Sequence, residues 1–248
     1  MNQPILLIDI SNSWTKVGLA TPKRIRKIAS VETSTLHSTH LKKWWRDLNP
    51  AHVMVASVVP KKTQLLLRSL PKKNVTLLNN DLPLPLKIDY PNPSSIGADR
   101  LANALAAISH YPLPAVVIDF GTAVTFDIIS HDKKYLGGVI APGLNAMTDY
   151  LHEKTALLPK INLRQPRCAI GKSTEEAMMV GAVIGYRGLI RGILHEIQKE
   201  LKTKKITIIA TGGQAQLISK TMHEVSEVNP LLTLEGLYAA YLHQNYSP

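Results

Sequence analysis

The sequence repeats one short segment, and this repeat restricts the fold more than any other feature does. Residues 5 to 19, ILLIDISNSWTKVGL, align without a gap with residues 115 to 129, AVVIDFGTAVTFDII. In each copy an apolar run ends at an acidic residue, Asp9 or Asp119, and small residues and a second apolar run follow. This order is typical of a buried strand, a tight turn and a second strand. We therefore predict that the chain uses one β-hairpin twice.

A second, weaker similarity pairs residues 53 to 60, VMVASVVP, with residues 207 to 214, TIIATGGQ. Short apolar runs alternate with helical patterns along the whole chain, which is the signature of an α/β fold. Because the two similarities occur in the same order, we predict a duplicated fold with two lobes, residues 1–114 and 115–248, and a nucleotide cleft between them. Strands are predicted at residues 5–10, 15–20, 25–31 and 52–57, and a loop without regular structure is predicted over the proline-rich residues 82–93.

The two predicted turns have residues that suit phosphate binding. Backbone N–H groups and small hydroxyls bind phosphate oxygens, and a carboxylate at a strand end can hold the cation that neutralises them. Gly212 and Gly213 follow a predicted strand, so their amides can approach a phosphate or an adenosine. Asp, Asn, Gly and Ser also dominate ordinary hairpin turns, so one copy alone would not distinguish binding from simple chain reversal.

Charge and cysteine content limit the class of protein. The formal net charge is +11, from 29 basic and 18 acidic residues, and residues 1–73 carry 13 of the basic and 3 of the acidic ones. A solvated basic face explains this excess, with a nucleic-acid surface or the steering of anionic ligands as alternatives. An aromatic content of 5% argues against a base-stacking surface. Cys168 is the single cysteine, which fits a reducing, cytoplasmic location.

We expect neither a signal peptide nor a membrane span. The first residues lack a basic leader, and Asp9 interrupts their apolar run. No apolar run comes near the roughly 18 residues that a spanning helix needs.

Two predicted helices carry further candidates. Asp99 and Arg100 begin an amphipathic helix, where the acid either accepts a proton or simply complements the helix dipole. Residues 173–201 are predicted as one long helix with Ser173 as the N-cap and Glu176 three residues later. Glycines recur in its apolar middle and let another helix approach closely, from the same chain or from a second copy; they are Gly181, Gly185, Gly188 and Gly192.

Six motifs, in this order, resemble those of the type III pantothenate kinases, a family of the actin, sugar kinase and Hsp70 superfamily with its duplicated, ribonuclease H-like fold. They are Asp9–Lys16, Gly97–Arg100, Asp119–Ala123, Gly137–Gly138 with Pro142–Gly143, Gly171–Ala177, and Thr211–Gly213. A Walker A loop is absent from the sequence, so P-loop kinases are excluded.

The resemblance implies ATP-dependent phosphorylation of pantothenate to 4'-phosphopantothenate, the first step of coenzyme A biosynthesis, by a cytoplasmic homodimer. It implies Asp99 as the proton acceptor, Asp9 near the Mg²⁺ of MgATP, and Asp119 as the ligand of a monovalent cation, K⁺ or NH₄⁺. The ATP-binding residues that it implies are Asp9, Ile10, Ser11, Asn12, Ser13, Trp14, Thr15, Lys16 and Thr122. The implied pantothenate residues are Tyr90, Gly97, Ala98, Asp99, Arg100 and Thr174, with Thr174 reaching the partner subunit's site.

This sequence departs from the family in its first loop, which usually reads D-x-G-N-T. Ser11 replaces the glycine and Ser13 the threonine. A Cβ at a position that needs an unusual φ would weaken nucleotide binding. Two other functions therefore stay open: another small-molecule kinase on the same fold, such as a sugar kinase, and a nucleic-acid-binding or regulatory protein that uses the basic first third.

Overall fold

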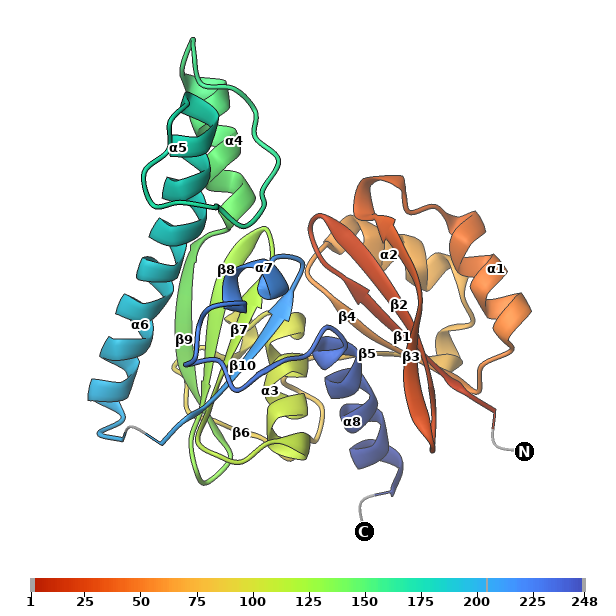
Figure 1. Ribbon diagram of the computed structural model, residues 1–248. Helices are drawn as coiled ribbons and strands as arrows, with labels where there is room; N and C mark the ends of the chain where they lie inside the picture. The colour runs from red at the N-terminus through yellow and green to blue at the C-terminus, as the bar shows by residue number, and fades with distance from the viewer. Residues whose placement is uncertain (1–2, 204, 247–248) are drawn as a thin grey trace. The chain divides into compact units, whose positions relative to one another are not determined.

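The structure is a computed structural model that describes residues 3–203 and 205–246 (Figure 1). Contacts divide the chain into two compact units. The first comprises Met1–Leu113, Ile129–Gly137 and Leu231–Pro248, and the second comprises Pro114–Ile128 and Gly138–Pro230. Both units combine segments that are distant in sequence, so they differ from the continuous lobes 1–114 and 115–248, which stay a prediction.

The first sheet has five strands in the order β3-β2-β1-β4-β5. Its central strand β1 (Ile5–Ile10) is buried along its whole length. β1 pairs antiparallel with β2 (Trp14–Thr21) and parallel with β4 (His52–Ser57), while β3 (Arg24–Glu32) and β5 (Val75–Leu77) form the edges. The predicted hairpin and the four predicted strands are therefore confirmed within one or two residues.

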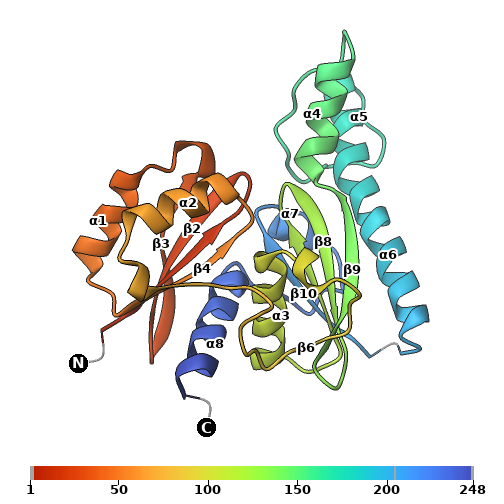
Figure 2. The ribbon, with the colours of Figure 1, turned by 180° about the vertical axis from the view of Figure 1, so that it is seen from behind.

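Helices cover both faces of this sheet. Leu41 of α1 (Ser38–Leu48) and Leu66 of α2 (Pro60–Ser69) belong to one apolar cluster with Ile8 and Ile10 of β1. α3 (Ala98–His110) and α8 (Leu232–Tyr246) pack side by side (Figure 2); α3 contacts β4, and α8 contacts β4 and β1. A buried hydrogen bond joins them, in which Thr233 Oγ1 donates to Asn103 Oδ1 at 2.9 Å. The fold thereby fixes the N-terminus of α3, where Asp99 lies.

The second sheet repeats the first. Its order is β11-β10-β7-β8-β9-β6, so β9-β8-β7-β10-β11 corresponds to β3-β2-β1-β4-β5. β7 pairs parallel with β10, as β1 does with β4. The strands are β7 (Ala115–Phe120), β8 (Ala123–Ile129), β9 (Lys134–Pro142), β10 (Thr207–Gly212) and β11 (Glu227–Val228). The predicted duplication is confirmed at the level of strand order.

The registers correct two details of the sequence alignment. Ile5 pairs with His52 and Ala115 pairs with Thr207, so residue 52 corresponds to residue 207, not residue 53. Because successive side chains of a strand point to opposite faces, this slip of one residue would exchange the two faces of the strand. The first turn also holds Ser11–Ser13 between its strands, whereas the second holds only residues 121 and 122.

The proline-rich loop also contains a short strand that we did not predict. β6 (Lys87–Ile88) pairs with the start of β9, and a 3₁₀ turn, η3 (Pro93–Ser95), follows. The prolines flank the paired residues, so Lys87 and Asp89 keep their amides and donate to Lys133 O at 3.1 Å and Tyr135 O at 3.0 Å. The prediction of a segment without regular structure is therefore wrong at these residues.

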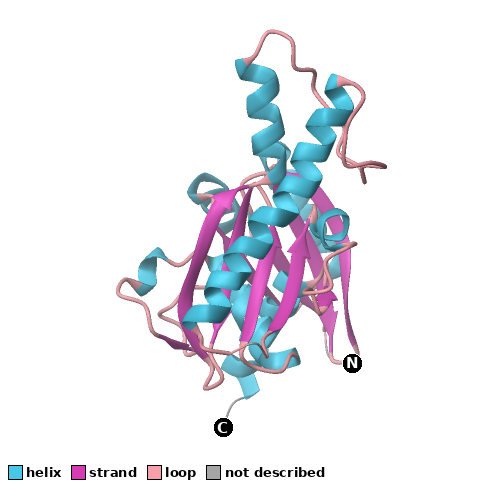
Figure 3. Cartoon of the chain, turned by 60° about the vertical axis from the view of Figure 1, so that its left-hand side comes forward, coloured by secondary structure: helices cyan, strands magenta, loops and turns pink. Residues whose placement is uncertain are grey.

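The long predicted helix is present, with an interruption. α5 (Thr174–Val180), a π-helical segment η4 (Gly181–Gly185) and α6 (Tyr186–Glu200) form one continuous rod beside α4 (Leu144–Lys154), as Figure 3 shows. Ser173 Oγ accepts the N–H of Glu176 at 3.2 Å, which confirms the predicted N-cap. A π-helical turn within an α-helix often marks a functional position.

The same rod bears on the expectation that the chain lacks a membrane span. Thr174–Glu200 is, at 27 residues, long and apolar enough to cross a membrane by length and composition. Glycines and single charged residues interrupt the apolar residues of this segment, so no continuous apolar run marks it in the sequence. A core helix of a soluble protein passes the same test, so this helix is weak support for a membrane span.

Candidate functional site

The carboxylate of Asp9 is held from both sides at the end of β1. Its side chain is almost completely buried. Ser11 Oγ donates to Asp9 Oδ1 at 2.9 Å, and Lys16 Nζ lies 3.9 Å from Asp9 Oδ2. In α/β sheets, ligands bind at the carboxyl ends of the parallel strands, and Asp9 lies at that end of β1 and β4.

The remaining residues of the first predicted loop fall into two groups. Asn12, Ser13 and Trp14 are exposed and can contact a ligand with their side chains. The side chain of Ile10 belongs to the core, and the buried hydroxyl of Thr15 lies 3.0 Å from Thr33 Oγ1. Thr33 in turn donates to Ser11 O at 2.7 Å, so Thr15 supports the turn from below.

Ser11 fits this turn without strain. The non-glycine residues with positive φ in the described chain are Asn49, Lys133 and Lys202, and Ser11 is not among them. The expectation that a glycine's backbone is needed at this position is therefore wrong. Ser11 adds a hydroxyl that donates a hydrogen bond to Asp9, so this residue can affect the site through its side chain and not through backbone strain.

Asp99 lies in the first turn of α3. Its Oδ1 accepts the N–H of Arg100 at 2.8 Å. A Cβ at Gly97 would lie 2.5 Å from Asp99 Oδ1 and 3.4 Å from Val58 Cγ1, so a side chain at residue 97 would displace the carboxylate. Val58 N donates to Ile10 O at 3.1 Å. Val58 is thus bonded to the residue after Asp9 and lies beside Gly97, two residues before Asp99.

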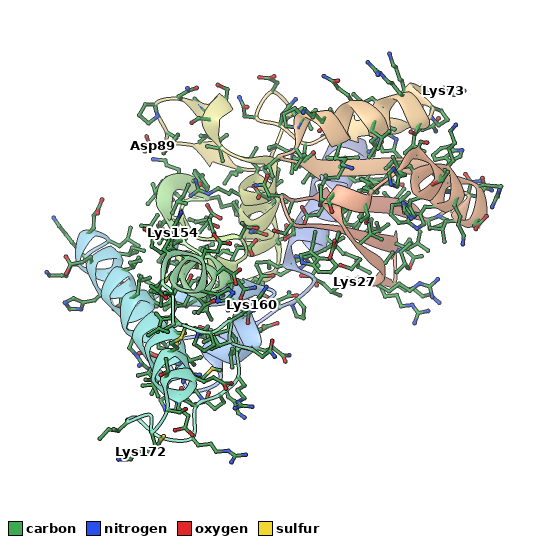
Figure 4. The ribbon with its side chains drawn as sticks, turned by 90° about the horizontal axis from the view of Figure 1, so that it is seen from above. Lys27, Lys73, Asp89, Lys154, Lys160 and Lys172 are labelled. Atoms are coloured by element: carbon green, nitrogen blue, oxygen red, sulfur yellow. The ribbon has the colours of Figure 1, made fainter. Side chains whose placement is uncertain are left out.

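Arg100 and Tyr90 are brought together by a residue that sequence reasoning missed. The Arg100 guanidinium carbon lies 5.8 Å from the ring centroid of Tyr135, which is fully buried. The rings of Tyr90 and Tyr135 meet edge to face at 6.3 Å. Asp89, labelled in Figure 4, precedes Tyr90 on the same loop. Tyr135 stands two residues before the Gly137–Gly138 motif, a position that gave no signal by itself.

The second hairpin places Asp119 beside the glycine turn after β10. Thr211 pairs with Asp119 across the sheet, and Gly212 has a φ of 93°. A Cβ on Gly212 would lie 2.5 Å from Asp119 Oδ1, so glycine is needed here for both backbone conformation and space. Thr122 is exposed, and its carbonyl accepts the N–H of Gly143 at 3.1 Å.

Thr174 belongs to the second unit, whereas Tyr90, Asp99 and Arg100 belong to the first. It is exposed at the start of α5 and lines an apolar groove of about 700 Å³ between α4 and the long rod. The groove is lined by Pro142, Ala146, Met147, Thr148, Tyr150, Leu151, Leu158, Thr174, Ala177, Met178, Gly181 and Ala182.

Metal-ligand clusters do not occur within residues 3–203 and 205–246: three or more His, Cys, Asp or Glu side chains converge nowhere there. A single carboxylate such as that of Asp9 is nevertheless a common protein contribution to Mg²⁺ that is bound mainly by nucleotide phosphates and water. The residues present therefore fit a metal that arrives with ATP better than a resident metal.

Comparison with known proteins identifies the family. The family model for "Type III pantothenate kinase" matches residues 5–196. The chain belongs to the type III pantothenate kinase family. A type III pantothenate kinase of Akkermansia muciniphila is 44% identical over 236 residues, which cover 95% of this chain and 97% of that relative.

Solved structures support the fold of this type III pantothenate kinase family member. A provisionally named Baf family transcriptional activator from Campylobacter jejuni has a TM-score of 0.61 at 20% identity and covers 97% of this chain and 98% of its own. A provisionally named 2-dehydro-3-deoxygalactonokinase from Sinorhizobium meliloti also has a TM-score of 0.61, at 12% identity, with 98% and 97% covered. The fold is that of the actin-like ATPases and sugar kinases, as predicted.

Proposed function

We propose that this chain transfers the γ-phosphoryl group of ATP to the primary hydroxyl of pantothenate, giving ADP and 4'-phosphopantothenate, the first step of coenzyme A biosynthesis. The proposal rests on membership of this family and on Val58, whose N–H donates to Ile10 O next to Asp9 and whose Cγ1 lies 3.4 Å from the Cβ position of Gly97, two residues before Asp99. One carboxylate lies at a strand end suited to phosphates and the other at a helix start suited to proton transfer.

Asp99 is proposed to accept the proton of the pantothenate hydroxyl. In the step, the hydroxyl oxygen bonds to the γ-phosphorus, the bond from that phosphorus to the β–γ bridging oxygen breaks, and the proton moves to the Asp99 carboxylate. Phosphoryl transfer passes through a loose transition state, so the proton leaves late and a positioned carboxylate suffices as the acceptor. The hydrogen bond from Arg100 N at 2.8 Å and the space at Gly97 support this orientation.

The two hairpin turns are proposed to bind the nucleotide. Asn12, Ser13 and Thr122 would offer N–H and hydroxyl groups to the phosphates, and Gly212 and Gly213 would approach the adenosine or a phosphate. Asp9 would hold Mg²⁺, which neutralises phosphate charge when it is bound with ATP. Asp119 would bind K⁺ or NH₄⁺; its position beside Gly212 supports a role next to the nucleotide.

Arg100 is proposed to bind the carboxylate of pantothenate. The ring of Tyr135 lies 5.8 Å from its guanidinium carbon and restricts its orientation, which favours a fixed ionic contact over a mobile one. Tyr90 contacts the same ring and would line the pocket. Thr174 would complete it from the partner subunit.

A homodimer is proposed because one face of the long rod is open. Nothing elsewhere in the described chain lies within 4 Å of the positions where Gly181, Gly185, Gly188 and Gly192 would carry a Cβ. Close packing inside one chain, the alternative to a second copy, therefore does not explain these glycines. The adjacent groove exposes Met147, Tyr150 and Leu151, and a second rod packed on this face would cover them. We also propose a cytoplasmic location, which the single cysteine fits.

The test is incubation of the purified protein with ATP, Mg²⁺, K⁺ and pantothenate, with the product identified by mass spectrometry. Conversion to a monophosphate by the wild type and not by Asp99→Asn is expected. Phosphorylation of a sugar acid or sugar in place of pantothenate would support the alternative that the chain is another small-molecule kinase on the same fold. A salt-dependent DNA titration tests the nucleic-acid alternative, which gains no support from Lys27 and Lys73, since they lie towards opposite edges of the first sheet (Figure 4).

A further inference from the structure

Two consecutive side chains at the start of α6 are buried against different parts of the second unit. Tyr186 is 1% exposed and Arg187 is 4% exposed. They directly follow the π-helical segment η4. A π-helical turn inserts one extra residue into a helix and changes which side chains face inward. Both side chains therefore face the rest of the unit just after the helix changes its pitch.

The guanidinium of Arg187 binds backbone carbonyls where a carboxylate would be expected. Its Nε donates to Ile218 O at 2.9 Å, and its Nη2 donates to Leu217 O and to Gln165 Oε1, each at 2.7 Å. Across the described residues, the carboxylates all lie more than 4.0 Å from this group. Burial lowers the pKa of Arg187, with repulsion from Arg191 as a smaller cause.

Burying the Arg187 cation with no acidic partner among the described residues costs free energy that an apolar side chain of similar volume would not cost. Replacing buried charges by apolar side chains of similar volume is often neutral or stabilising, so packing alone does not call for an arginine. The carbonyls that it binds belong to the end of α7 (Ala215–Ser219), where helical carbonyls lack intrahelical partners. Arg187 therefore fixes the orientation of α7.

Fixing α7 also fixes the glycine turn in front of it. Only Gly213 and Gln214 separate β10 from α7, and Gln214 N donates to Phe120 O at 3.4 Å. A helix of five residues moves as one piece, so a shift at Leu217 and Ile218 would displace Gly213. The two hydrogen bonds from Arg187 to Leu217 O and Ile218 O thus act on the turn that the proposed function assigns to ATP.

Tyr186 acts in the same way on the other turn. Its hydroxyl donates to Pro142 O at 2.9 Å, and its ring centroid lies 6.4 Å from that of Phe120. Phe120 follows Asp119, and Gly143, which follows Pro142, donates to Thr122 O. Tyr186 therefore supports the turn at Asp119–Thr122 from beneath.

We propose that Tyr186 and Arg187 are positioning residues that hold the two nucleotide-side turns of the second unit in place, so that α6 sets the affinity for ATP. This inference rests on the proposed function, in which both turns contact the nucleotide. Neither residue touches the reacting atoms. Their loss should therefore weaken nucleotide binding and leave pantothenate binding unaltered.

The experiment measures Kd for a fluorescent ATP analogue without pantothenate, together with KM for ATP and for pantothenate. Loss of one hydrogen-bonded support corresponds to about a fivefold change or more, so we expect Arg187→Ala to raise Kd and the KM for ATP by about five- to fiftyfold. The KM for pantothenate should change less than about twofold, and free guanidinium ion should restore part of the affinity by filling the vacated position. Tyr186→Phe, which removes only the bond to Pro142, should raise Kd by about two- to fivefold.

Arg191→Ala is the matched control. Arg191 lies one turn later on the same helix and also binds the segment after α7, through Glu224 Oε1 at 2.6 Å and Thr221 O at 3.3 Å, but it is exposed. Its removal should leave Kd within about twofold of wild type. A similar loss for Arg191→Ala would mean a general effect of loosening α6 and would overturn the inference.

Two further results would overturn it: a folded Arg187→Ala with unchanged Kd, or a rise in both KM values that guanidinium does not reverse. If circular dichroism shows that Arg187→Ala is unfolded, Arg187→Lys is measured in its place, because lysine keeps the charge but reaches at most some of the three acceptors. An unchanged Kd in Arg187→Lys would refute the positioning role of Arg187. A wild type that binds the analogue without phosphorylating pantothenate refutes the proposed function only, and the Kd comparison still decides this inference. A wild type that does not bind the analogue refutes both.

Discussion

Ser11 donates a hydrogen bond of 2.9 Å to Asp9 Oδ1, while Lys16 faces the other carboxylate oxygen at 3.9 Å. The residue that departs from the family's loop therefore acts on the carboxylate that we assign to Mg²⁺. Because the backbone at Ser11 is unstrained, any effect of this serine on nucleotide binding comes from its side chain.

Replacement of Ser11 by glycine should strengthen MgATP binding. The serine hydroxyl occupies a lone pair of Asp9 that would otherwise accept a hydrogen from metal-bound water, and one such bond is worth about 1 kcal/mol, or about fivefold. We expect the KM for ATP to fall by about two- to fivefold in Ser11→Gly. Ser11→Ala separates the causes: an equal fall implicates the hydroxyl, a fall only in Ser11→Gly implicates the Cβ, and a rise in both would mean that the hydroxyl itself binds ATP.

Asp99→Asn should abolish most turnover and leave the fold intact. Asparagine has nearly the same shape but cannot take up the proton, so kcat should fall by roughly 10² to 10⁴. Circular dichroism and the KM for ATP should stay near their wild-type values. Asp132→Asn, which changes an exposed carboxylate in the turn before β9, serves as the control. Near-normal kcat in Asp99→Asn would remove Asp99 from the catalytic role.

The sequence predicted what depends on local pattern and missed what depends on distant contacts. The two hairpins were found because an apolar run and an acidic residue at its end recur in the same order, and Ser173 was found because its cap is completed by Glu176 within one turn. Tyr135 was missed because its partners Tyr90 and Arg100 are far away in the chain. Likewise, Tyr186 and Arg187 bind groups 44 and 30 residues away, and nothing in the surrounding helix pattern distinguishes them.

Stability should fall in mild acid because of His52. Its Nε2 lies 2.8 Å from Thr76 Oγ1, its ring packs on Tyr241, and burial lowers its pKa in the folded chain below the ordinary histidine value of 6.5. Well above pH 6.5 this residue is neutral in both the folded and the unfolded chain. As the pH falls through 6.5, the unfolded chain takes up the proton first and is favoured. Thermal unfolding at pH 7.5 and pH 5 should show this loss. His52→Gln should reduce the difference in Tm, and an unchanged difference would assign the effect to other groups.

Activity should depend on K⁺ or NH₄⁺ through Asp119. The carboxylate lies beside Gly212, where a cation would reach the nucleotide turn. Removing its charge in Asp119→Asn should raise the K⁺ concentration for half-maximal activity by about tenfold or more, since a charge-assisted interaction is worth about 1.5–3 kcal/mol. Glu196→Gln on the exposed face of α6 should leave the K⁺ dependence unchanged. Equal wild-type activity in buffer with Na⁺ as the single monovalent cation would refute the assignment.

Mixing two impaired variants should restore part of the kinase activity if Thr174 serves the partner's site. Asp99 and Thr174 belong to different units of one chain, and the open glycine face of the rod lies next to the groove that Thr174 lines. We expect Asp99→Asn and Thr174→Val each to lose most activity as homodimers. In a mixed dimer with Thr174 acting across the interface, one site carries both defects and the other carries neither. Random pairing makes half of the dimers mixed, each with one intact site, so the mixture should recover about a quarter of wild-type activity.

Native mass spectrometry of the mixture establishes that subunits have exchanged. Gly185→Leu, which adds bulk to the glycine face, should leave the chain monomeric and abolish the recovery. Exchange without recovery would mean that Thr174 serves the site of its own chain or has no part in it.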